Sequence, residues 1–197
     1  VLCNEPQIFC YFCLLLIEKN TYHMGEHICF RRNERLATVN PHWRGNPVVR
    51  GKFVNRQHRF RPGMGSVLKW RLSPNPQRKE KKSVKWSPKL NYLRSLDGVV
   101  GNSLIWLGHN SFFLQLGRKR IMFDPVFGDI PFVKRQSDFP ANPDIFTDID
   151  YLLISHDHFD HLDKQSVARL VKNNPGMKLF CGLGTGELIK GWFPEFE

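Results

Sequence analysis

Three histidines lie within six positions of one another in the stretch 151–163, with carboxylates between them. His156 and His158 are two residues apart, so in an extended segment both rings fall on one face and can bind one metal ion. Asp160 and His161 are adjacent, and a turn after His158 would direct both side chains toward a second ion. Imidazole and carboxylate are usual ligands of zinc, and imidazole also suits iron. The alternative is a solvated polar loop whose histidines have no role.

The elements that would position these residues alternate between strands and helices. Residues 151–154 are apolar or aromatic, which is typical of a short buried strand. Asp163 is a good N-cap for a helix with one apolar face, and the glycine cluster 182–186 indicates a turn from a strand into a second short helix. Gly117-Arg118 is a plausible hairpin turn between two earlier strands. The expected strands are 103–107, 112–116, 120–123, 151–154 and 177–181, and the expected helices are 164–172 and 187–191.

The pattern His-x-His-x-Asp-His at 156–161 resembles the metal motif of the metallo-β-lactamase superfamily. Two upstream segments, Ile-Trp-Leu-Gly-His-Asn-Ser at 105–111 and Phe-Asp-Pro-Val-Phe at 123–127, resemble the start of one branch of it. That branch contains N-acyl-phosphatidylethanolamine-hydrolysing phospholipase D and the ascorbate-6-phosphate lactonases, and residues 154–163 are especially similar to the phospholipase D version. The resemblance covers roughly residues 102–197 and implies the first half of an αββα sandwich, an α/β fold.

By this resemblance, His156 and His158 would bind the first metal ion, and Asp160 and His161 would bind the second. Asp160 is also the residue that we expect to be catalytic. Two zinc ions are expected in the complete protein, with iron or manganese as alternatives. Hydrolysis by a metal-bound hydroxide is the expected chemistry. The first substrate class is a phosphodiester of a phospholipid, the lactone of a sugar phosphate is the second, and a nuclease is a third reading.

Two further residues enter on the same resemblance. His109 lies in the turn between the first two strands, near the expected active site, and would contact substrate or a ligand; the alternative is a hydrogen bond that stabilises the turn. Asp124 ends the third strand, before Pro125. It would orient a ligand histidine, because a carboxylate often holds the second ring nitrogen of a metal-bound imidazole. The alternative for Asp124 is a cap on a turn.

The charge of the chain is uneven along its length. The net charge is +11, but residues 1–95 carry 19 Lys and Arg against 5 acids, or +14, whereas residues 96–197 carry 10 against 13, or −3. We therefore expect a basic, loop-rich arm at 24–101 ahead of the hydrolase domain at 102–197. Basic residues interleaved with aromatics can contact anionic lipid head groups or nucleic acid. The plainer interpretation is an arm that packs its aromatics on the domain, and nucleic acid is not the expected partner.

The first 23 residues are a separate question. Their apolar run, 8–17, is too short to span a bilayer, and Met24 is the first methionine. Residues 1–23 are interpreted as sequence translated upstream of the true start, or else as a weak anchor. The five cysteines have no zinc-ribbon or disulfide spacing, which favours a reducing compartment. The expected location is therefore the cytoplasm, with peripheral membrane attachment as an extension of that reading.

The motif lacks part of the family's ligand set. By resemblance, a third ligand of the first metal, a bridging carboxylate and a last histidine would lie beyond residue 197, and no histidine follows His161. We therefore expect an apolar face and an edge of the half-sheet to be uncovered. We also expect residues 1–197 alone to bind metal weakly and to hydrolyse nothing at a useful rate. An inactive fragment is the remaining alternative.

Overall fold

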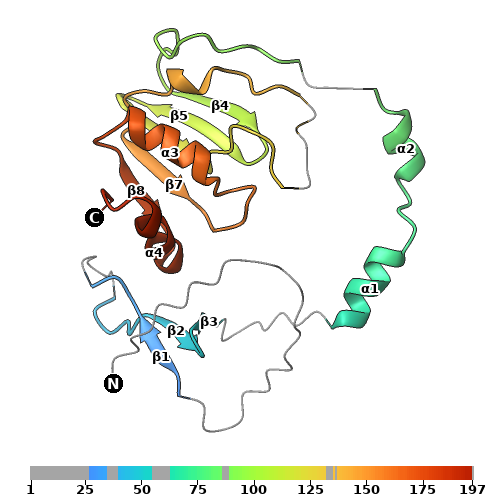
Figure 1. The fold of residues 1–197 in the computed structure, drawn as a ribbon, viewed down its shortest axis with the longest axis vertical. Coiled ribbons are helices and arrows are strands. Elements are labelled where there is room, and N and C mark those ends of the chain that lie inside the picture. The colour runs from blue at the N-terminus through green and yellow to red at the C-terminus, as the bar shows by residue number, and fades with distance from the viewer. Residues whose placement is uncertain are drawn as a thin grey trace. The chain divides into compact units, whose positions relative to one another are not determined.

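The computed structural model describes residues 27–34, 40–54, 63–85, 89–131, 135 and 137–196. The chain forms two compact units, Val1–Val84 and Lys85–Glu197 (Figure 1). Segment 1–23 lies outside the described residues, so both interpretations of it stay predictions. The alternation of strands and helices in the second unit confirms the predicted α/β class.

The second unit is built on a mixed five-stranded sheet in the order β4-β5-β6-β7-β8. The first three strands form the predicted antiparallel meander, and Leu116 pairs with Lys119 across the Gly117-Arg118 turn. β7 is parallel to β6, and β8 is parallel to β7. Each strand was predicted to within one residue at each end: β4 (Ser103–Gly108), β5 (Ser111–Leu116), β6 (Lys119–Phe123), β7 (Tyr151–Ile154) and β8 (Lys178–Cys181).

The core of this unit lies between one face of the sheet and two helices, α3 (Lys164–Asn173) and α4 (Leu183–Trp192). α3 begins at the predicted N-cap, where the Asp163 carboxylate accepts a hydrogen bond from Ser166 N at 2.9 Å. Figure 1 shows α3 beside β7 and α4 beside β8. The side chains that meet in the core are fully or almost fully buried: Leu107, Phe113, Met122, Leu152, Val167, Leu170 and Ile189.

The start of α4 corrects one prediction. Residues 182–186 were expected to form a turn before a helix at 187–191, but the helix begins at Leu183 and contains two of these glycines. Tertiary packing explains the difference. A Cβ on Gly186 would lie 3.3 Å from Cys181 Sγ, so glycine lets the helix approach the end of β8 closely. The weak helix propensity of glycine is outweighed by this close contact.

The second face of the sheet carries large apolar side chains at alternate positions of all five strands. Leu104 and Trp106 of β4 and Phe180 of β8 are 66%, 55% and 54% exposed. Leu116 of β5 is also exposed, at 54%, and the remaining members of this face are half-buried, which agrees with the expected uncovered apolar face. They are Phe112, Leu114, Ile121, Phe123, Tyr151 and Leu153.

The connection from β6 to β7 is irregular apart from a short 3-10 helix, η1 (Pro143–Ile145). Phe127 and Phe139 pack on the buried Phe146, with ring centroids 5.8 and 6.2 Å away. These two partly buried phenylalanines therefore pack against the core of the unit, while Phe132 lies outside the described residues. The side chain of Asn174, at the end of α3, holds this connection in place. Its Oδ1 accepts a hydrogen bond from Ile149 N, and its Nδ2 donates one to Phe146 O.

The first unit contains more regular structure than the predicted loop-rich arm. A small antiparallel sheet forms from β1 (Cys29–Arg31), β2 (Asn46–Val49) and β3 (Lys52–Phe53), and α1 (Met64–Leu72) follows. A second helix of this arm is α2 (Arg78–Ser83). The run Arg-Lys-Glu-Lys-Lys consists of good helix formers, and Asn75 caps the preceding turn by accepting from Gln77 N at 2.9 Å. No helix of the described residues is long and apolar enough to cross a membrane.

Candidate metal centre

The predicted site residues gather where two parallel neighbours, β6 and β7, end. Asp124 follows β6, and Ser155 and His156 follow β7. Because parallel strands present their carboxyl ends at the same edge of a sheet, side chains from both strands meet there. The backbone confirms the alignment, since Asp124 N donates to Leu153 O at 3.0 Å.

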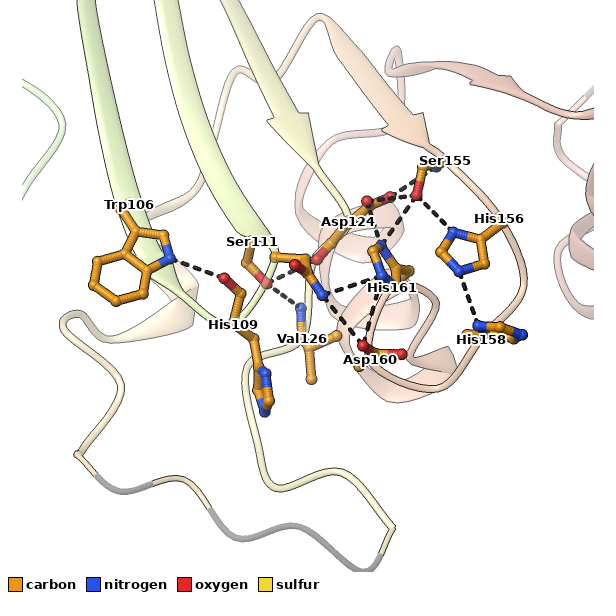
Figure 2. Close-up of polar contacts among 11 residues, drawn as sticks. Trp106, His109, Ser111, Asp124, Val126, Ser155, His156, His158, Asp160 and His161 are labelled. Carbon is orange, nitrogen blue, oxygen red and sulfur yellow. Dashed lines mark hydrogen bonds and ion pairs between the residues drawn. The ribbon is translucent and has the colours of Figure 1, made fainter. Parts of the chain in front are cut away.

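Asp124 accepts hydrogen bonds from three groups (Figure 2). Oδ1 accepts from Ser155 N at 2.8 Å, and Oδ2 accepts from the Ser155 hydroxyl at 2.7 Å and contacts His161 Nδ1 at 2.8 Å. The Asp124 side chain is 11% exposed. A carboxylate accepts only, so in a neutral His161 ring the proton sits on Nδ1 and the lone pair on Nε2.

A tight turn brings the motif back on itself. His161 N and Leu162 N both donate to His158 O, at 2.9 and 2.8 Å, and the buried Leu162 anchors the turn in the core. His156 Nε2 then lies 3.0 Å from His158 Nδ1. The ring centroids of His156 and His161 are 4.0 Å apart, so the three motif imidazoles form one cluster.

The nitrogen and oxygen atoms of the motif that could bind metal lie in two pairs, each of which could hold one ion. His161 Nε2 is 3.6 Å from Asp160 Oδ2, and Asp124 leaves the Nε2 lone pair available. His156 Nε2 and His158 Nδ1 form the second pair. Within the described part of the chain, however, no three His, Cys, Asp or Glu side chains come together as a set that could hold an ion. The chemistry of each pair fits a divalent ion, and the ligand roles stay predictions.

Three contacts around the motif were missed from the sequence. Asn110 Nδ2 lies 3.2 Å from Asp160 Oδ2 and 3.1 Å from His161 Nε2. The Ser155 hydroxyl links Asp124 to His156, with Oγ 3.0 Å from Nδ1. The buried Ser111 hydroxyl donates to Asp124 O at 2.7 Å and accepts from Val126 N at 2.9 Å, which fixes the backbone at the end of β6.

His109 lies next to this cluster, but its ring is directed away from the other histidines (Figure 2). Its carbonyl accepts from Trp106 Nε1 at 2.9 Å, and its φ is 50°. The hydrogen bond that stabilises the turn is therefore accepted by the His109 backbone carbonyl and does not involve the ring. The predicted contact of its side chain with substrate or a ligand stays a prediction.

Arg135 fastens the same turn to the loop after β6. Its guanidinium donates to Leu107 O at 2.6 Å and to Val126 O at 3.2 Å. A Cβ on Gly108 would lie 2.2 Å from Arg135 Nη2, so only glycine leaves room for this contact. Burial lowers the pKa of Arg135, and its Nε lacks a hydrogen-bond partner among the described residues.

Comparisons with known proteins match the part of the chain that contains this cluster. A family model described as a beta-lactamase superfamily domain matches residues 119–197. N-acyl-phosphatidylethanolamine-hydrolyzing phospholipase D 1 of Caenorhabditis elegans is 28% identical over 160 residues, which cover 73% of this chain and 45% of that protein. A UPF0173 metal-dependent hydrolase of Saccharolobus solfataricus is 35% identical over 78 residues, covering 40% of this chain and 31% of that protein. Among solved structures, CmlA, a diiron β-hydroxylase from Streptomyces venezuelae, overlaps at 20% identity with a TM-score of 0.30, over 66% of this chain and 24% of that one.

The family match includes the motif at 156–161 and confirms the predicted resemblance to the metallo-β-lactamase superfamily. The chain spans less than half the length of the C. elegans relative. The 73% of this chain that aligns with that relative is more than residues 102–197 can supply. Similarity therefore continues upstream of the motifs, into the range that the sequence indicated as the basic arm.

Proposed function

We propose that this chain, whose residues 119–197 carry the beta-lactamase superfamily domain, is the metal-binding part of a phosphodiester hydrolase that acts on a phospholipid. The observation that carries the proposal is the contact between Asp124 Oδ2 and His161 Nδ1 at 2.8 Å. That contact places the ring proton on Nδ1 and leaves the lone pair on Nε2, which lies 3.6 Å from Asp160 Oδ2, so the two atoms can serve as a ligand pair.

Two ions are proposed, held by His156 and His158 on one side and by Asp160 and His161 on the other. When bound, zinc supplies an activated water nucleophile and stabilises charge on phosphoryl oxygens. The protein residues orient the donors. Ser155 fixes His156, because its hydroxyl hydrogen goes to Asp124 and its oxygen can then accept from His156 Nδ1. The proton on Nδ1 leaves the lone pair of His156 on Nε2, which faces His158.

The phospholipid substrate is supported by the C. elegans relative, whose name assigns it a phospholipase D activity. It is also supported by the basic first unit. Arg78, Lys79 and Lys82 of α2 are exposed, and Trp70 and Leu72 of α1 are 79% and 74% exposed. Basic residues close to exposed apolar side chains suit an anionic membrane surface. Nothing in the described residues favours a sugar-phosphate lactone or nucleic acid as substrate.

The first test is metal binding by the metal-depleted chain. Zn²⁺ is titrated against a chromophoric chelator for the wild type, for His161→Gln and for Asp157→Asn as the control. Asp157 is exposed, lies within the same loop and is not a proposed ligand. We expect measurable binding that His161→Gln weakens and Asp157→Asn leaves unchanged. Equal binding in all three proteins, or binding in none, contradicts the proposed centre.

The second test addresses the substrate. The protein isolated from its natural source is assayed with N-acylated phosphatidylethanolamine in vesicles and with a sugar-phosphate lactone, before and after metal removal by a chelator. Metal-dependent conversion of this lipid into phosphatidic acid and N-acylethanolamine supports the proposal. Turnover of the lactone alone contradicts the phosphodiester assignment but does not contradict the proposed metal centre.

A further inference from the structure

Asn110 reaches the one pair of donor atoms that the proposed function assigns to the second ion. It lies in the turn between β4 and β5, a position set by the left-handed backbone of Gly108 and His109, with φ of 95° and 50°. The hydroxyl of the next residue, Ser111, donates to Asp124 O and accepts from Val126 N, which holds the turn in place. Asn110 is therefore presented from a fixed turn, and its half-buried amide contacts Asp160 and His161.

The orientation of the Asn110 amide follows from its partners. His161 Nδ1 faces the Asp124 carboxylate, so the neutral ring has only a lone pair on Nε2. Asp160 Oδ2 is also an acceptor. Two acceptors at 3.1 and 3.2 Å from the same amide nitrogen match its two N–H groups, whereas the amide oxygen would be repelled by both.

We infer that the Asn110 amide and a metal ion compete for the same lone pair on His161 Nε2. A ring nitrogen has one lone pair, so it can accept from Asn110 or bind an ion, but it cannot do both. Loading the Asp160–His161 pair thus requires the Asn110–His161 hydrogen bond to break. The inference rests on the proposed function, and it makes Asn110 the residue that sets how tightly this side of the centre holds its ion.

The His156–His158 pair provides the internal comparison. The described hydrogen bonds of these two rings are to Ser155 and to each other, so an Asn110 substitution leaves them in place. Only the ion on the Asp160–His161 side is expected to respond. In the metal-free chain, the Asn110 amide contacts both Asp160 and His161 and keeps the two side chains close together. This structural role explains why a side chain that opposes metal binding lies at this position.

The test uses Asn110→Ala, Asn110→Asp and, as a matched control, Ala in place of Asn91, an exposed asparagine ahead of β4. Zn²⁺ affinity of the metal-depleted chain is measured by chelator competition. Asn110→Ala removes the hydrogen bond to His161 Nε2, which stabilises only the metal-free state. The loss of that one hydrogen bond should make Zn²⁺ binding about two- to tenfold tighter. Asn110→Asp has no N–H to donate and adds a carboxylate, so its affinity should rise by more. The Asn91 variant should match the wild type.

A second measurement does not depend on the substitutions. In ¹⁵N-labelled wild type, the Asn110 side-chain amide should be hydrogen-bonded without metal, and its signals should shift and exchange faster with water once Zn²⁺ is added. Tighter binding together with release of the amide supports the inference. If the chain binds Zn²⁺ but Asn110→Ala binds equally or more weakly, and the amide does not respond, competition is refuted and the metal centre stands. If no variant binds metal, both the inference and the proposed function fail.

If Asn110→Ala does not fold, as judged by circular dichroism, then the Asp variant, which keeps the side-chain shape, and the amide measurement decide between these outcomes.

Discussion

Asp124 is the residue on which the candidate centre depends most, and two substitutions separate its structural role from its chemical one. Asp124→Ala removes the acceptor for Ser155 N, for the Ser155 hydroxyl and for His161 Nδ1. Asp124→Asn keeps the shape and the Oδ1 acceptor, but it can place an N–H group against His161 Nδ1. The first change should destabilise the fold, whereas the second should mainly alter which ring nitrogen of His161 carries the proton.

The magnitudes follow from the three hydrogen bonds. Hydrogen bonds to a charged group contribute about 1.5–3 kcal/mol each when buried, and neutral ones contribute about 0.5–1.5 kcal/mol. Ser155 is exposed, so water can replace part of what it loses. We therefore expect Asp124→Ala to lower the free energy of unfolding by about 3 kcal/mol and Asp124→Asn by about 1 kcal/mol. Zn²⁺ affinity should fall by about 10- to 100-fold in the Asn variant, as for other residues that orient ligands.

Urea unfolding followed by tryptophan fluorescence gives the stability, and chelator competition gives the affinity. The control is Asp148→Asn, because the Asp148 side chain is 85% exposed and forms an ion pair with Arg120 at 3.3 Å. It should change neither quantity appreciably. A stable Asp124→Asn protein with unchanged Zn²⁺ affinity would refute the argument that Asp124 selects the tautomer of His161.

Three further predictions concern the rest of the chain. Asn174→Ala should lower the free energy of unfolding by about 2–4 kcal/mol in urea melts, because the buried amide bonds Ile149 N, Phe146 O and Leu170 O. The hydrogen bond from Lys119 lowers the pKa of Asp150, so its contribution to stability is complete above about pH 4 and is lost as the pH falls through the lowered value. Acid unfolding of Asp150→Asn should therefore lack that part of the pH dependence. Exchanging Lys79 and Lys82 for Glu should reduce sedimentation with anionic vesicles and leave neutral vesicles unaffected.

Each of these predictions has an outcome that contradicts it. An Asn174→Ala protein as stable as the wild type would mean that its three contacts do not form in solution. Identical acid unfolding of wild type and Asp150→Asn would remove the role given to the lysine contact. Vesicle binding that survives the Lys79 and Lys82 exchange, or nucleic-acid binding that disappears with it, would contradict the membrane assignment.

The parts of the fold that could be predicted from sequence are those set by local patterns. The five strands of the second unit are short apolar runs between turn signals, and Asp163 is an N-cap followed by an apolar stripe. The four ligands could be proposed from sequence because they are close together in the chain. The start of α4 was predicted wrongly because a glycine was judged by its local propensity, while its contact with Cys181 is tertiary.

The contacts that were missed join residues distant in sequence. Asn110 is 50 residues from Asp160, and no spacing rule connects an asparagine in a hairpin turn with a histidine motif. Ser155 lies beside the motif, but serine in a loop carries no signal of its own until Asp124 is known to face it. α2 was missed because the arm was expected to be loop-rich, although its six residues include a run of good helix formers.

The crossover between β6 and β7 has a consequence for how the centre is made. A peptide of residues 151–163 contains every proposed ligand, but it lacks Asp124, which follows β6. Without Asp124 the His161 tautomer is unset and the rotamers of the ring are free, so metal binding to the peptide would include the entropy cost of ordering it. In the intact chain that ordering is complete once β6 and β7 pair. Zn²⁺ binding therefore reports whether β7 has paired with β6. A folding intermediate that has formed the β4–β6 meander without β7 should not bind Zn²⁺.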